Sequence, residues 1–584
     1  MFKRLKALDW IEIAICMLLI VINVWLELKI PDYMSKITTL IETPGTEMKE
    51  IWIQGGYMLA CAFGGLATTV VTSFFAARIS SALGFRLRSE IYQKVNAFSM
   101  EEINKFSTSS LITRTTNDVN QVQMVLAMGI QVMIKAPVLA IWAVCKISGK
   151  SLWWTLATAG AVLVLIAILS VVIIFALPKF KIMQKLTDNL NRVTRENLTG
   201  VRVVRAYNAE GYQEEKFENA NQKLTKTTLF TNRIMAIMGP GMTLIMSMLS
   251  LAIYWIGAYL INKASLFDRL EIFSNMVVYS SYAIQVVMAF IMLIVIFILL
   301  PRASVSAKRI NEVLETEVKV KDGELQVLPK TDGTVEFKNV CFKYPGASEY
   351  VLKDVSFKAN KGETIAFIGS TGSGKSTLIN LIPRFYDATE GSVVIDGVNV
   401  KNYKQKDLHE KIGYVSQKAI IFSGDVASNI AFNDDSKVND KKLKNMEYAA
   451  DISQASEFIY GLKDGFSSRV AQSGTNLSGG QKQRISIARA VYKKPEIMIF
   501  DDSFSALDYK TDKLVRKKLK TSLKDTTTFI VAQRIGTIKN ADKIIVLDEG
   551  KVVGIGTHHD LMKNCPVYQE IALSQLTKEE LENA

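Results

Sequence analysis

Long apolar runs dominate residues 1–300, and charged residues are almost absent from them. A helix needs about 20 apolar residues to cross the hydrocarbon core of a bilayer. Each run is close to that length, and soluble domains rarely contain such runs. The pattern therefore predicts six membrane-spanning helices, near residues 10–29, 56–77, 128–147, 153–177, 236–261 and 274–300.

The connections between these spans differ in length and charge. Those after the first, third and fifth spans are short and neutral or acidic, and the first contains Asp32, Glu42, Glu47 and Glu50. Those after the second and fourth spans are long and basic, and stretches such as RLRSEIYQKVNAF are typical of charged helix. Because basic connections stay in the cytoplasm, both long connections and both termini are predicted to be cytoplasmic, with the spanning helices continuing beyond the bilayer.

The pattern changes in the last part of the chain. Residues 334–584 alternate short apolar strands with helical segments, as in a soluble α/β domain. The predicted architecture is an all-α transmembrane domain with six helices at 1–302, a linker at 303–333 and an α/β phosphate-loop domain at 334–584.

A glycine-rich loop follows the apolar strand at 364–368. The stretch GSTGSGKS fits G-x-x-x-x-G-K-[ST], in which backbone N–H groups and the N-terminus of the following helix bind phosphate oxygens. Lys375 would reach the β- and γ-phosphates of a nucleotide, and Ser376 would ligate Mg²⁺. The candidate nucleotide-binding residues of the loop are Gly369, Ser370, Thr371, Gly372, Ser373, Gly374, Lys375, Ser376 and Thr377. A strand before and a helix after argue against a chance glycine turn.

Two carboxylates end a second apolar strand. In MIFDD, Asp501 stands at the carboxyl end of the strand, where it would hold Mg²⁺ beside the nucleotide. A turn or helix-capping aspartate is the alternative, and the phosphate loop upstream disfavours it. The second carboxylate, Asp502, has no role that this stretch alone decides.

The stretch NLSGGQKQRISIARA strongly resembles the signature of ATP-binding-cassette (ABC) transporters. The LSGGQ residues are Leu477, Ser478, Gly479, Gly480 and Gln481. Tyr344 in CFKYP resembles the family's aromatic that stacks on adenine. Gln417 in GYVSQ resembles the Q-loop glutamine that touches Mg²⁺, and Asp508 in SALD belongs to a segment similar to the D-loop. Six spans followed by one cassette resemble a half-size exporter of the type I fold, over essentially the whole chain.

The resemblance implies a dimer. In this family the signature grips the γ-phosphate of a nucleotide that the opposite cassette holds, so two cassettes enclose two ATP molecules with Mg²⁺. It also implies coupling helices at the cytoplasmic tips of the long helices, near Ser107–Thr113 and Gly200–Tyr207. A half-size chain must therefore pair with a second chain.

Two positions depart from the family pattern. Asp502 stands where efficient cassettes carry a catalytic glutamate, and Gln533 stands where the switch histidine belongs. The histidines of the chain, His409, His558 and His559, all lie elsewhere. Aspartate is one methylene shorter than glutamate, and general-base geometry is sensitive on that scale. Two altered catalytic positions argue against neutral drift in a working site.

The signature, in contrast, is intact. The hypothesis is a heterodimeric exporter whose non-identical partner supplies the glutamate and histidine, resembling heterodimeric bacterial multidrug exporters. This chain's own site would bind ATP but hydrolyse it slowly. A homodimeric exporter or a lipid flippase remains an alternative, and an ATP-gated regulator or channel is an alternative of another class. Dye uptake into inside-out vesicles would favour the exporter, and ion conductance on ATP addition the channel.

Composition adds little to this picture. The formal charge of +14, from 70 basic and 56 acidic residues, fits the cytoplasmic connections of a membrane protein, so no nucleic-acid partner is expected. The odd number of cysteines without a CxxC pair favours buried apolar roles over disulfides or metal ligands. The basic residues Lys3, Arg4 and Lys6 precede a run long enough to span, so no cleavable signal peptide is expected. The resemblance to bacterial exporters implies that the chain lies in the cytoplasmic membrane of a bacterium.

The substrate is the least determined property. Methionine and aromatic residues are frequent in the fifth and sixth spans, which suits amphipathic drugs or lipids, although lipid contact or helix packing explains them equally well. They are Met235, Met238, Met242, Met246, Met248, Met276, Met288, Met292, Phe273, Tyr279, Tyr282 and Phe290. The ionisable residues Glu12 and Lys135 would contact substrate, snorkel to the interface or pair between helices.

Overall fold

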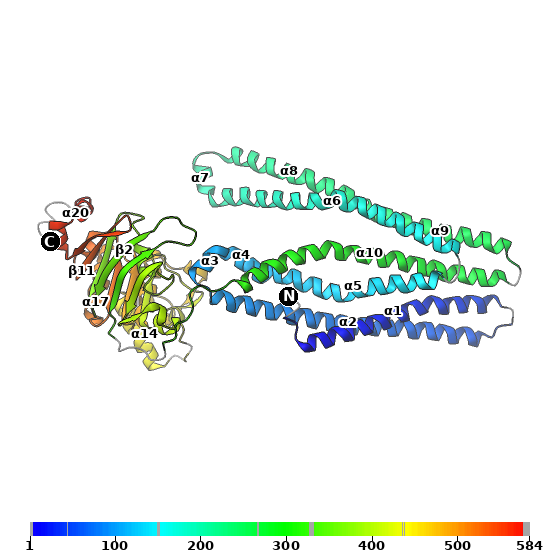
Figure 1. Cartoon of the computed structure of the whole chain (residues 1–584), viewed down its shortest axis with the longest axis horizontal. Helices are drawn as coiled ribbons and strands as arrows, with labels where there is room; N and C mark the ends of the chain where they lie inside the picture. The colour runs from blue at the N-terminus through cyan, green and yellow to red at the C-terminus, as the bar shows by residue number, and fades with distance from the viewer. Residues whose placement is uncertain are drawn as a thin grey trace. The chain divides into compact units, whose positions relative to one another are not determined.

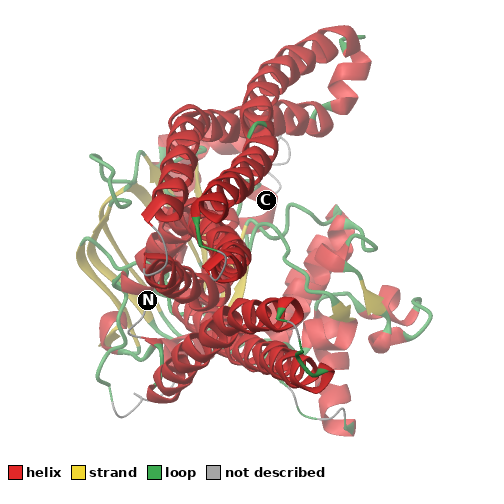
Figure 2. Cartoon of the chain, turned by 90° about the vertical axis from the view of Figure 1, so that its right-hand side faces the viewer, coloured by secondary structure: helices red, strands yellow, loops and turns green. Residues whose placement is uncertain are grey.

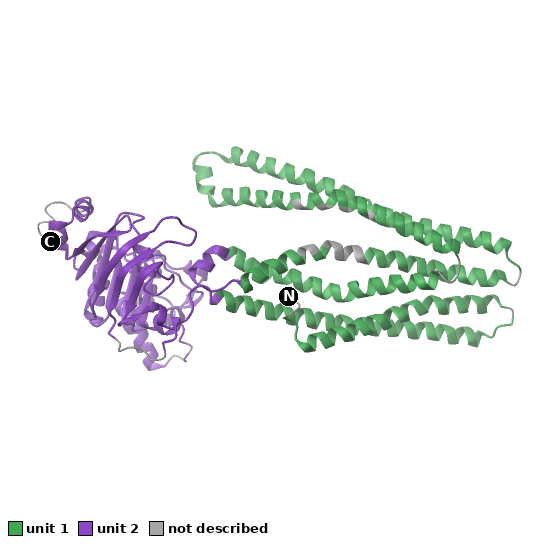
Figure 3. Ribbon diagram, in the orientation of Figure 1, with its two compact units in different colours: residues 1–95, 109–315 green, residues 96–108, 316–584 purple. Residues whose placement is uncertain are grey.

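The computed structural model describes residues 4–43, 45–148, 152–265, 268–325, 332–434, 436 and 439–575. Lys3 and residues 326–331 of the predicted linker lie outside these ranges. The chain divides into two compact units (Figure 3). The first contains residues 1–95 and 109–315, and the second contains residues 96–108 and 316–584. Each unit is described by itself.

The first unit is built from helices, several of them very long (Figure 1). They are α1 (Ala7–Glu42), α2 (Met48–Asn96), α4 (Thr108–Thr113), the π-helix η2 (Arg114–Asp118), α5 (Val119–Ser148), α6 (Leu152–Thr199), α7 (Val201–Ala206), α8 (Glu210–Ala236), α9 (Met238–Lys263) and α10 (Asp268–Glu315). Helix α10 packs along α5, and α6 packs along α8.

Within the described residues, six helices are long and apolar enough to cross a membrane, which confirms the six predicted spans. They are Ala7–Glu42, Met48–Asn96, Thr108–Ile147, Leu152–Thr199, Glu210–Lys263 and Asp268–Met292. Large apolar side chains such as Trp52 and Trp255 stay exposed on them, as expected where lipid replaces water. Each helix extends well past the apolar run that predicts it.

These extensions change two boundaries. Asp32 and Glu42, predicted in the first connection, lie inside α1, and Glu50 lies inside α2, so the first connection is shorter than expected. Helix α10 runs past residue 302 to Glu315. The first residues of the predicted linker are therefore helical, because a long helix packed against α5 does not end where its apolar run ends.

Polar groups inside the first unit pair with one another. Glu12 pairs with Arg78 at 3.4 Å, and Lys135 pairs with Glu27 at 2.9 Å, each across two helices. Of the alternatives for Glu12 and Lys135, the structure has interhelical pairing. A buried apolar cluster that includes Trp154, Tyr279 and Tyr282 holds α1, α5, α6, α9 and α10 together.

The cysteines differ in burial. Cys16, Cys61 and Cys565 are buried, as predicted. Cys145 is exposed, because it lies on the apolar surface of α5, and Cys341 is half-buried on a strand.

The second unit begins with a short helix from the long connection after α2. This helix, α3 (Met100–Phe106), is closed at its start by a capping box between Ser99 and Glu102. The predicted coupling segments both coincide with short helices, α4 in the first and α7 in the second.

The strands of the described residues all belong to the second unit (Figure 2). The described residues form an antiparallel sheet with the order β2-β1-β4-β5, a sheet with the order β12-β11-β3-β10-β9-β6, and a two-stranded sheet of β7 and β8. The strands are β1 (Val335–Phe342), β2 (Leu352–Ala359), β3 (Thr364–Gly369), β4 (Glu390–Ile395), β5 (Val398–Asn399), β6 (Ile412–Val415), β7 (Gly424–Asp425), β8 (Arg469–Val470), β9 (Ile497–Asp501), β10 (Thr527–Val531), β11 (Lys543–Asp548) and β12 (Lys551–Gly556).

Further helices of the second unit lie between and after these strands along the chain. They are α11 (Lys375–Asn380), α12 (Gln405–Lys411), α13 (Val426–Ile430), α14 (Asp440–Ile452), α15 (Ser456–Tyr460), α16 (Gly479–Tyr492), α17 (Tyr509–Ser522), α18 (Ile535–Ile538), α19 (His558–Asn564) and α20 (Pro566–Leu573). Strands β6, β9, β10, β3 and β11 are parallel, so their carboxyl ends meet at one edge. There Val531 of β10 pairs with Asp501 on one side and Phe367 on the other, and this edge is where ligands bind in such sheets.

Candidate nucleotide site

The phosphate loop joins β3 to α11 at that edge. Gly369 has φ +155°, and a Cβ there would stand 2.0 Å from the carbonyl oxygen of Leu547, so only glycine fits against β11. Gly374 caps α11 in the left-handed conformation, with φ +96°. Residues 370–373 of the motif lie between these two glycines, and Lys375, Ser376 and Thr377 follow in the first turn of α11. The backbone geometry is thus the one that a phosphate cradle requires.

The Lys375 side chain folds back over the loop. Its ammonium group donates to the carbonyl oxygens of Gly369 at 2.9 Å and of Ser370 at 2.7 Å. Burial lowers the pKa of Lys375, and the carboxylates of Asp502 and Asp501 oppose this effect. A cation held at the mouth of an N–H-rich loop can pair with the phosphate oxygens of a nucleotide.

Asp501 lies where the predicted metal site requires a carboxylate. Its Oδ1 accepts from the Ser376 hydroxyl at 2.8 Å, and its Oδ2 accepts from the Tyr414 hydroxyl at 3.4 Å. Burial raises the pKa of Asp501, although the two hydroxyl donors and Lys375 counteract it. A hydroxyl and a carboxylate beside a phosphate loop are the hard oxygen donors that Mg²⁺ prefers, so the residues fit this ion. Tyr414 belongs to the GYVSQ stretch, but the sequence did not assign a role to this residue.

Three predicted residues, Asp502, Gln417 and Gln533, contact one another through the Asp502 carboxyl group. Its Oδ2 accepts from the side-chain amide of Gln533 at 2.8 Å and from that of Gln417 at 3.3 Å. The residue is 8% exposed and has φ +45°, a conformation that is uncommon outside glycine. The hydroxyl of Ser505, the first residue of the SALD segment, donates to the Asp502 carbonyl at 2.7 Å and holds this turn. Gln417, predicted at the metal, therefore has its amide directed at Asp502.

The environment of Asp502 favours its neutral form. Burial raises the pKa of the Asp502 carboxyl, and the nearby charge of Asp501 raises it further, whereas hydrogen bonding from Gln417 lowers it. An amide N–H₂ group donates and does not accept, so Gln533 and Gln417 both donate to the same carboxyl oxygen, Oδ2. The carboxylate is positioned by these amides rather than left open to solvent.

Tyr344 lies in an aromatic cluster beside α11. Its hydroxyl shares a hydrogen bond with the Thr377 hydroxyl at 2.9 Å, and its ring meets Tyr386 edge-on, with centroids 5.5 Å apart. The two tyrosines line a cavity of about 370 Å³ with Phe342. Tyr386 was missed in the sequence, where an aromatic in RFYD carries no periodic signal. A flat cavity bounded by aromatic rings can hold a nucleobase.

The signature forms the start of α16. The Ser478 hydroxyl accepts from the Gln481 N–H at 3.3 Å, and the Gln481 side chain accepts from the Ser478 N–H at 2.8 Å, which makes a complete capping box. Ser478 and Gly479 are exposed, whereas Leu477 is buried beneath them. A fourteen-residue helix thus presents its N-terminus to solvent, where an anion from another molecule can bind.

The D-loop segment connects the end of β9 with the start of α17. Asp508 caps α17, with its side chain accepting from the Thr511 N–H at 3.0 Å, and this backbone hydrogen bond lowers the pKa of Asp508. The turn from Asp502 to Asp508 therefore runs directly from the candidate catalytic carboxylate to a helix start.

Comparison with known proteins supports the resemblance to ABC transporters. The model of the ABC transporter transmembrane region matches residues 13–290, and that of the ABC transporter domain matches residues 352–505. An uncharacterised ABC transporter ATP-binding protein of Mycobacterium tuberculosis is 39% identical over 531 residues, which are 89% of this chain and 87% of the relative. YfiB of Bacillus subtilis, also an uncharacterised ABC transporter ATP-binding protein, is 35% identical over 537 residues, 91% of each.

Two further proteins place the chain among exporters. The ATP-dependent lipid A-core flippase of Pseudomonas aeruginosa is 31% identical over 509 residues, 86% of this chain and 82% of the flippase. A bacterial Atm1-family ABC exporter solved with ATP bound has a TM-score of 0.80 at 22% identity, covering 97% of this chain and 98% of that one, and shows the shared type I exporter fold. The chain therefore belongs to the ABC transporter family, as an ATP-hydrolysing integral membrane exporter with one membrane domain and one ATP-binding domain.

Proposed function

We propose that this chain is one half of a heterodimeric exporter and that its own nucleotide site is degenerate. Its phosphate loop would bind MgATP and hydrolyse it slowly, while its signature would complete a competent site on a non-identical partner chain. The observation that carries the proposal is the hydrogen bond of 2.8 Å from Gln533 to Asp502.

Slow hydrolysis is expected from the position of the Asp502 carboxyl group. A general base must lie within hydrogen-bond reach of the attacking water, and an error of about 1 Å can cost 100-fold in rate. Asp502 is shorter than glutamate, and its Oδ2 already accepts from Gln533 and Gln417. Gln533 is a neutral amide and lacks the charge that a protonated histidine would offer to the γ-phosphate. Both changes reduce catalysis without removing any part of the phosphate loop.

The binding residues have separate roles in this proposal. Lys375 pairs with the β- and γ-phosphates, Ser376 and Asp501 hold Mg²⁺, and Tyr344 stacks on adenine. Mg²⁺ would neutralise charge on the bridging phosphate oxygens. Gln417 would approach the ion only after leaving Asp502, to which it donates at 3.3 Å.

The intact signature supports a distinct partner. Ser478, Gly479 and Gly480 keep an exposed helix N-terminus, which is of use only if a γ-phosphate reaches it from another cassette. A partner with glutamate and histidine at the two altered positions would make that site hydrolytic. We place the complex in the cytoplasmic membrane of a bacterium, with both termini and the ATP-binding domain in the cytoplasm.

Amphipathic drugs or lipids are the substrates that we propose. Met248 and Met288 remain exposed on α9 and α10 and offer flexible thioether surface, whereas Met276, Tyr279 and Tyr282 are buried among helices. The flippase relative favours lipid as a second candidate cargo. Uptake of a fluorescent dye and of a fluorescent phospholipid into inside-out vesicles separates these cargoes.

The test is expression of the full chain alone and with the transporter chain that copurifies with it. The lone chain should bind ATP in photolabelling but hydrolyse little, and the pair should hydrolyse readily. Brisk hydrolysis by the lone chain that Asp502→Ala abolishes would overturn the proposal.

A further inference from the structure

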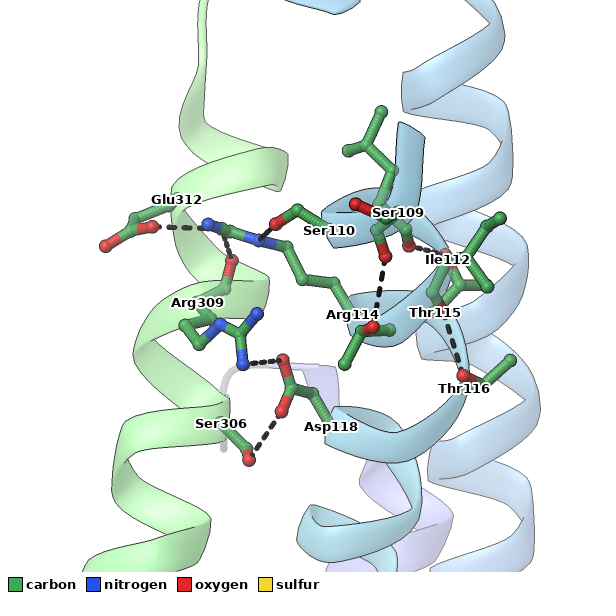
Figure 4. A network of polar contacts seen from close by, with 12 residues as sticks. Ser109, Ser110, Ile112, Arg114, Thr115, Thr116, Asp118, Ser306, Arg309 and Glu312 are labelled. Carbon is green, nitrogen blue, oxygen red and sulfur yellow. Dashed lines mark hydrogen bonds and ion pairs between the residues drawn. The ribbon is translucent and has the colours of Figure 1, made fainter. Parts of the chain in front are cut away.

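The chain passes between its two compact units three times, at 95/96, 108/109 and 315/316. A rearrangement of the ATP-binding unit that travels along the chain must enter the membrane helices at one of these points. The second crossing is followed by residues 110–118, and the third is preceded by residues 306–312. These two segments are joined by a partly buried polar network (Figure 4).

The segment after the second crossing contains an irregular turn. The π-helix η2 occupies Arg114–Asp118, between α4 and α5. Such turns close their hydrogen bonds five residues apart instead of four, are rare and often mark functional sites. Arg114 and Asp118, four positions apart in this turn, lie on the same side of the helix. Arg114 and Asp118 are 9% and 5% exposed, and both side chains face α10 in Figure 4.

Asp118 holds two residues of α10. Its Oδ1 accepts from the Ser306 hydroxyl at 2.8 Å, and its Oδ2 pairs with Arg309 at 3.3 Å. Arg114 reaches the same helix one turn further on. It pairs with Glu312 at 2.9 Å and donates to the backbone carbonyl of Arg309.

The network is reciprocal. Arg114 extends from η2 to α10, and Arg309 extends from α10 to Asp118 (Figure 4). The three residues of α10 recur at spacing three, which keeps them on one face of that helix. A slide of one helix past the other by one turn, about 5.4 Å, would break both ion pairs together and leave Asp118 as an unpaired buried charge.

We infer that Arg114 and Asp118 are positioning residues of the transport cycle. They hold the start of α5 against the end of α10. A displacement transmitted through the chain at 108/109 or at 315/316 therefore moves both helices together. The role is independent of which nucleotide site hydrolyses ATP. It concerns the transfer of ATP-driven change, not the binding of ATP.

The test compares Asp118→Asn with a matched variant, Asp9→Asn. Asp9 pairs with Arg86 of another helix at 2.7 Å, and both aspartates have the same exposure of 5%. Hydrogen exchange of α5 and α10 is measured in the full-length protein in lipid nanodiscs, with and without MgATP. Photolabelling with 8-azido-ATP reports binding in parallel.

Asp118→Asn should retain ATP binding, while the MgATP-induced change in the opening equilibrium of α5 falls on the order of tenfold. Asp9→Asn should respond like the unmodified protein. The exchanged pair Asp118→Arg with Arg309→Asp should recover most of the response, because it restores opposite charges. Ser306→Ala should reduce the response partly, and it replaces Asp118→Asn as the test variant if Asp118→Asn does not fold. An unchanged response in both Asp118→Asn and Ser306→Ala, an equal loss in Asp9→Asn, or no recovery in the exchanged pair would overturn the inference.

Discussion

The two nucleotide-facing regions of the ATP-binding domain differ in how closely they keep the chemistry of their family. At the carboxyl end of β9, Asp502 replaces a glutamate and accepts from Gln533, which replaces a histidine. At the start of α16, Ser478 and Gln481 form a complete capping box below two glycines. In the proposed function, the first region binds this chain's own ATP without the usual catalytic groups, and the second contacts the ATP of the partner chain. The two regions would then serve different nucleotides.

The largest effect is expected at the signature. Ser478→Ala should lower ATP hydrolysis by the assembled pair by about 100- to 1,000-fold. The variant lacks one hydrogen-bond donor that stabilises the negative charge developing on the phosphate during phosphoryl transfer. The ATP affinity of this chain's own loop should stay unchanged. Steady-state hydrolysis and photolabelling of each chain measure the two quantities.

The control for Ser478→Ala is Thr557→Ala. Thr557 caps α19 with a similar capping box, so its loss costs about 1 kcal/mol of helix stability without touching a nucleotide region. Comparable loss of hydrolysis in both variants would mean that Ser478 acts only as a helix cap.

A gain of function should follow repair of the other region. Asp502→Glu combined with Gln533→His should raise hydrolysis at this chain's site by about 100-fold, which is within the usual contribution of a general base. Asp502→Glu alone should gain much less, because Gln533 would still donate to the new carboxylate. Single-turnover loss of γ label from 8-azido-ATP crosslinked to this chain in the copurified pair measures both. Equal rates for the single and double variants would contradict the role of Gln533.

Removal of the loop cation should separate binding from hydrolysis. Lys375→Met should weaken ATP binding at this chain by on the order of tenfold to 100-fold, since a charge-assisted hydrogen bond contributes about 1.5–3 kcal/mol. Hydrolysis on the partner chain should fall less than it does with Ser478→Ala. The opposite ranking of the two variants would show that the regions are assigned to the wrong nucleotides.

The smallest effect concerns stability against pH. Burial raises the pKa of Asp501 and of Asp502 in the folded protein, so the folded state binds protons more tightly than the unfolded chain. The stability from these protons is fully present below the unfolded pKa of about 3.9 and is lost as pH rises through the raised pKa. Asp502→Asn should therefore raise the Tm of the nucleotide-free protein slightly at pH 7, and this gain should disappear near pH 4.

The control for the pH effect is Asp525→Asn. Asp525 is an exposed carboxylate of the same unit, with a side chain 92% accessible. Its removal should leave the Tm profile unchanged. A rise in Tm that is independent of pH in Asp502→Asn would argue against the raised pKa as its source.

The spans and the nucleotide motifs were predictable because each depends on local sequence. Apolar length alone fixes a span, and a phosphate loop needs its glycines at fixed positions, as at Gly369. The extension of α1 past Asp32 and of α10 to Glu315 was not predictable, since polar helix is stabilised there by packing against other helices.

The side-chain partners were also beyond the sequence. Gln417 is identified by its motif, but its hydrogen bond to Asp502 rather than to Asp501 depends on how the carboxyl ends of β6, β9 and β10 meet. Tyr386 and η2 lack any periodic or motif signal. They become visible only when distant segments are brought side by side, as in the pairing of Asp118 with Arg309.

The most direct measurement follows the fate of the γ-phosphate on each chain. The copurified pair is given 8-azido-ATP labelled at either the α- or the γ-phosphate, crosslinked during turnover and separated into its chains. This chain should keep nearly equal α and γ label, because its site retains unhydrolysed ATP, whereas the partner should keep α label and lose γ label. Equal loss of γ label from both chains would contradict the asymmetry between Asp502 and Ser478.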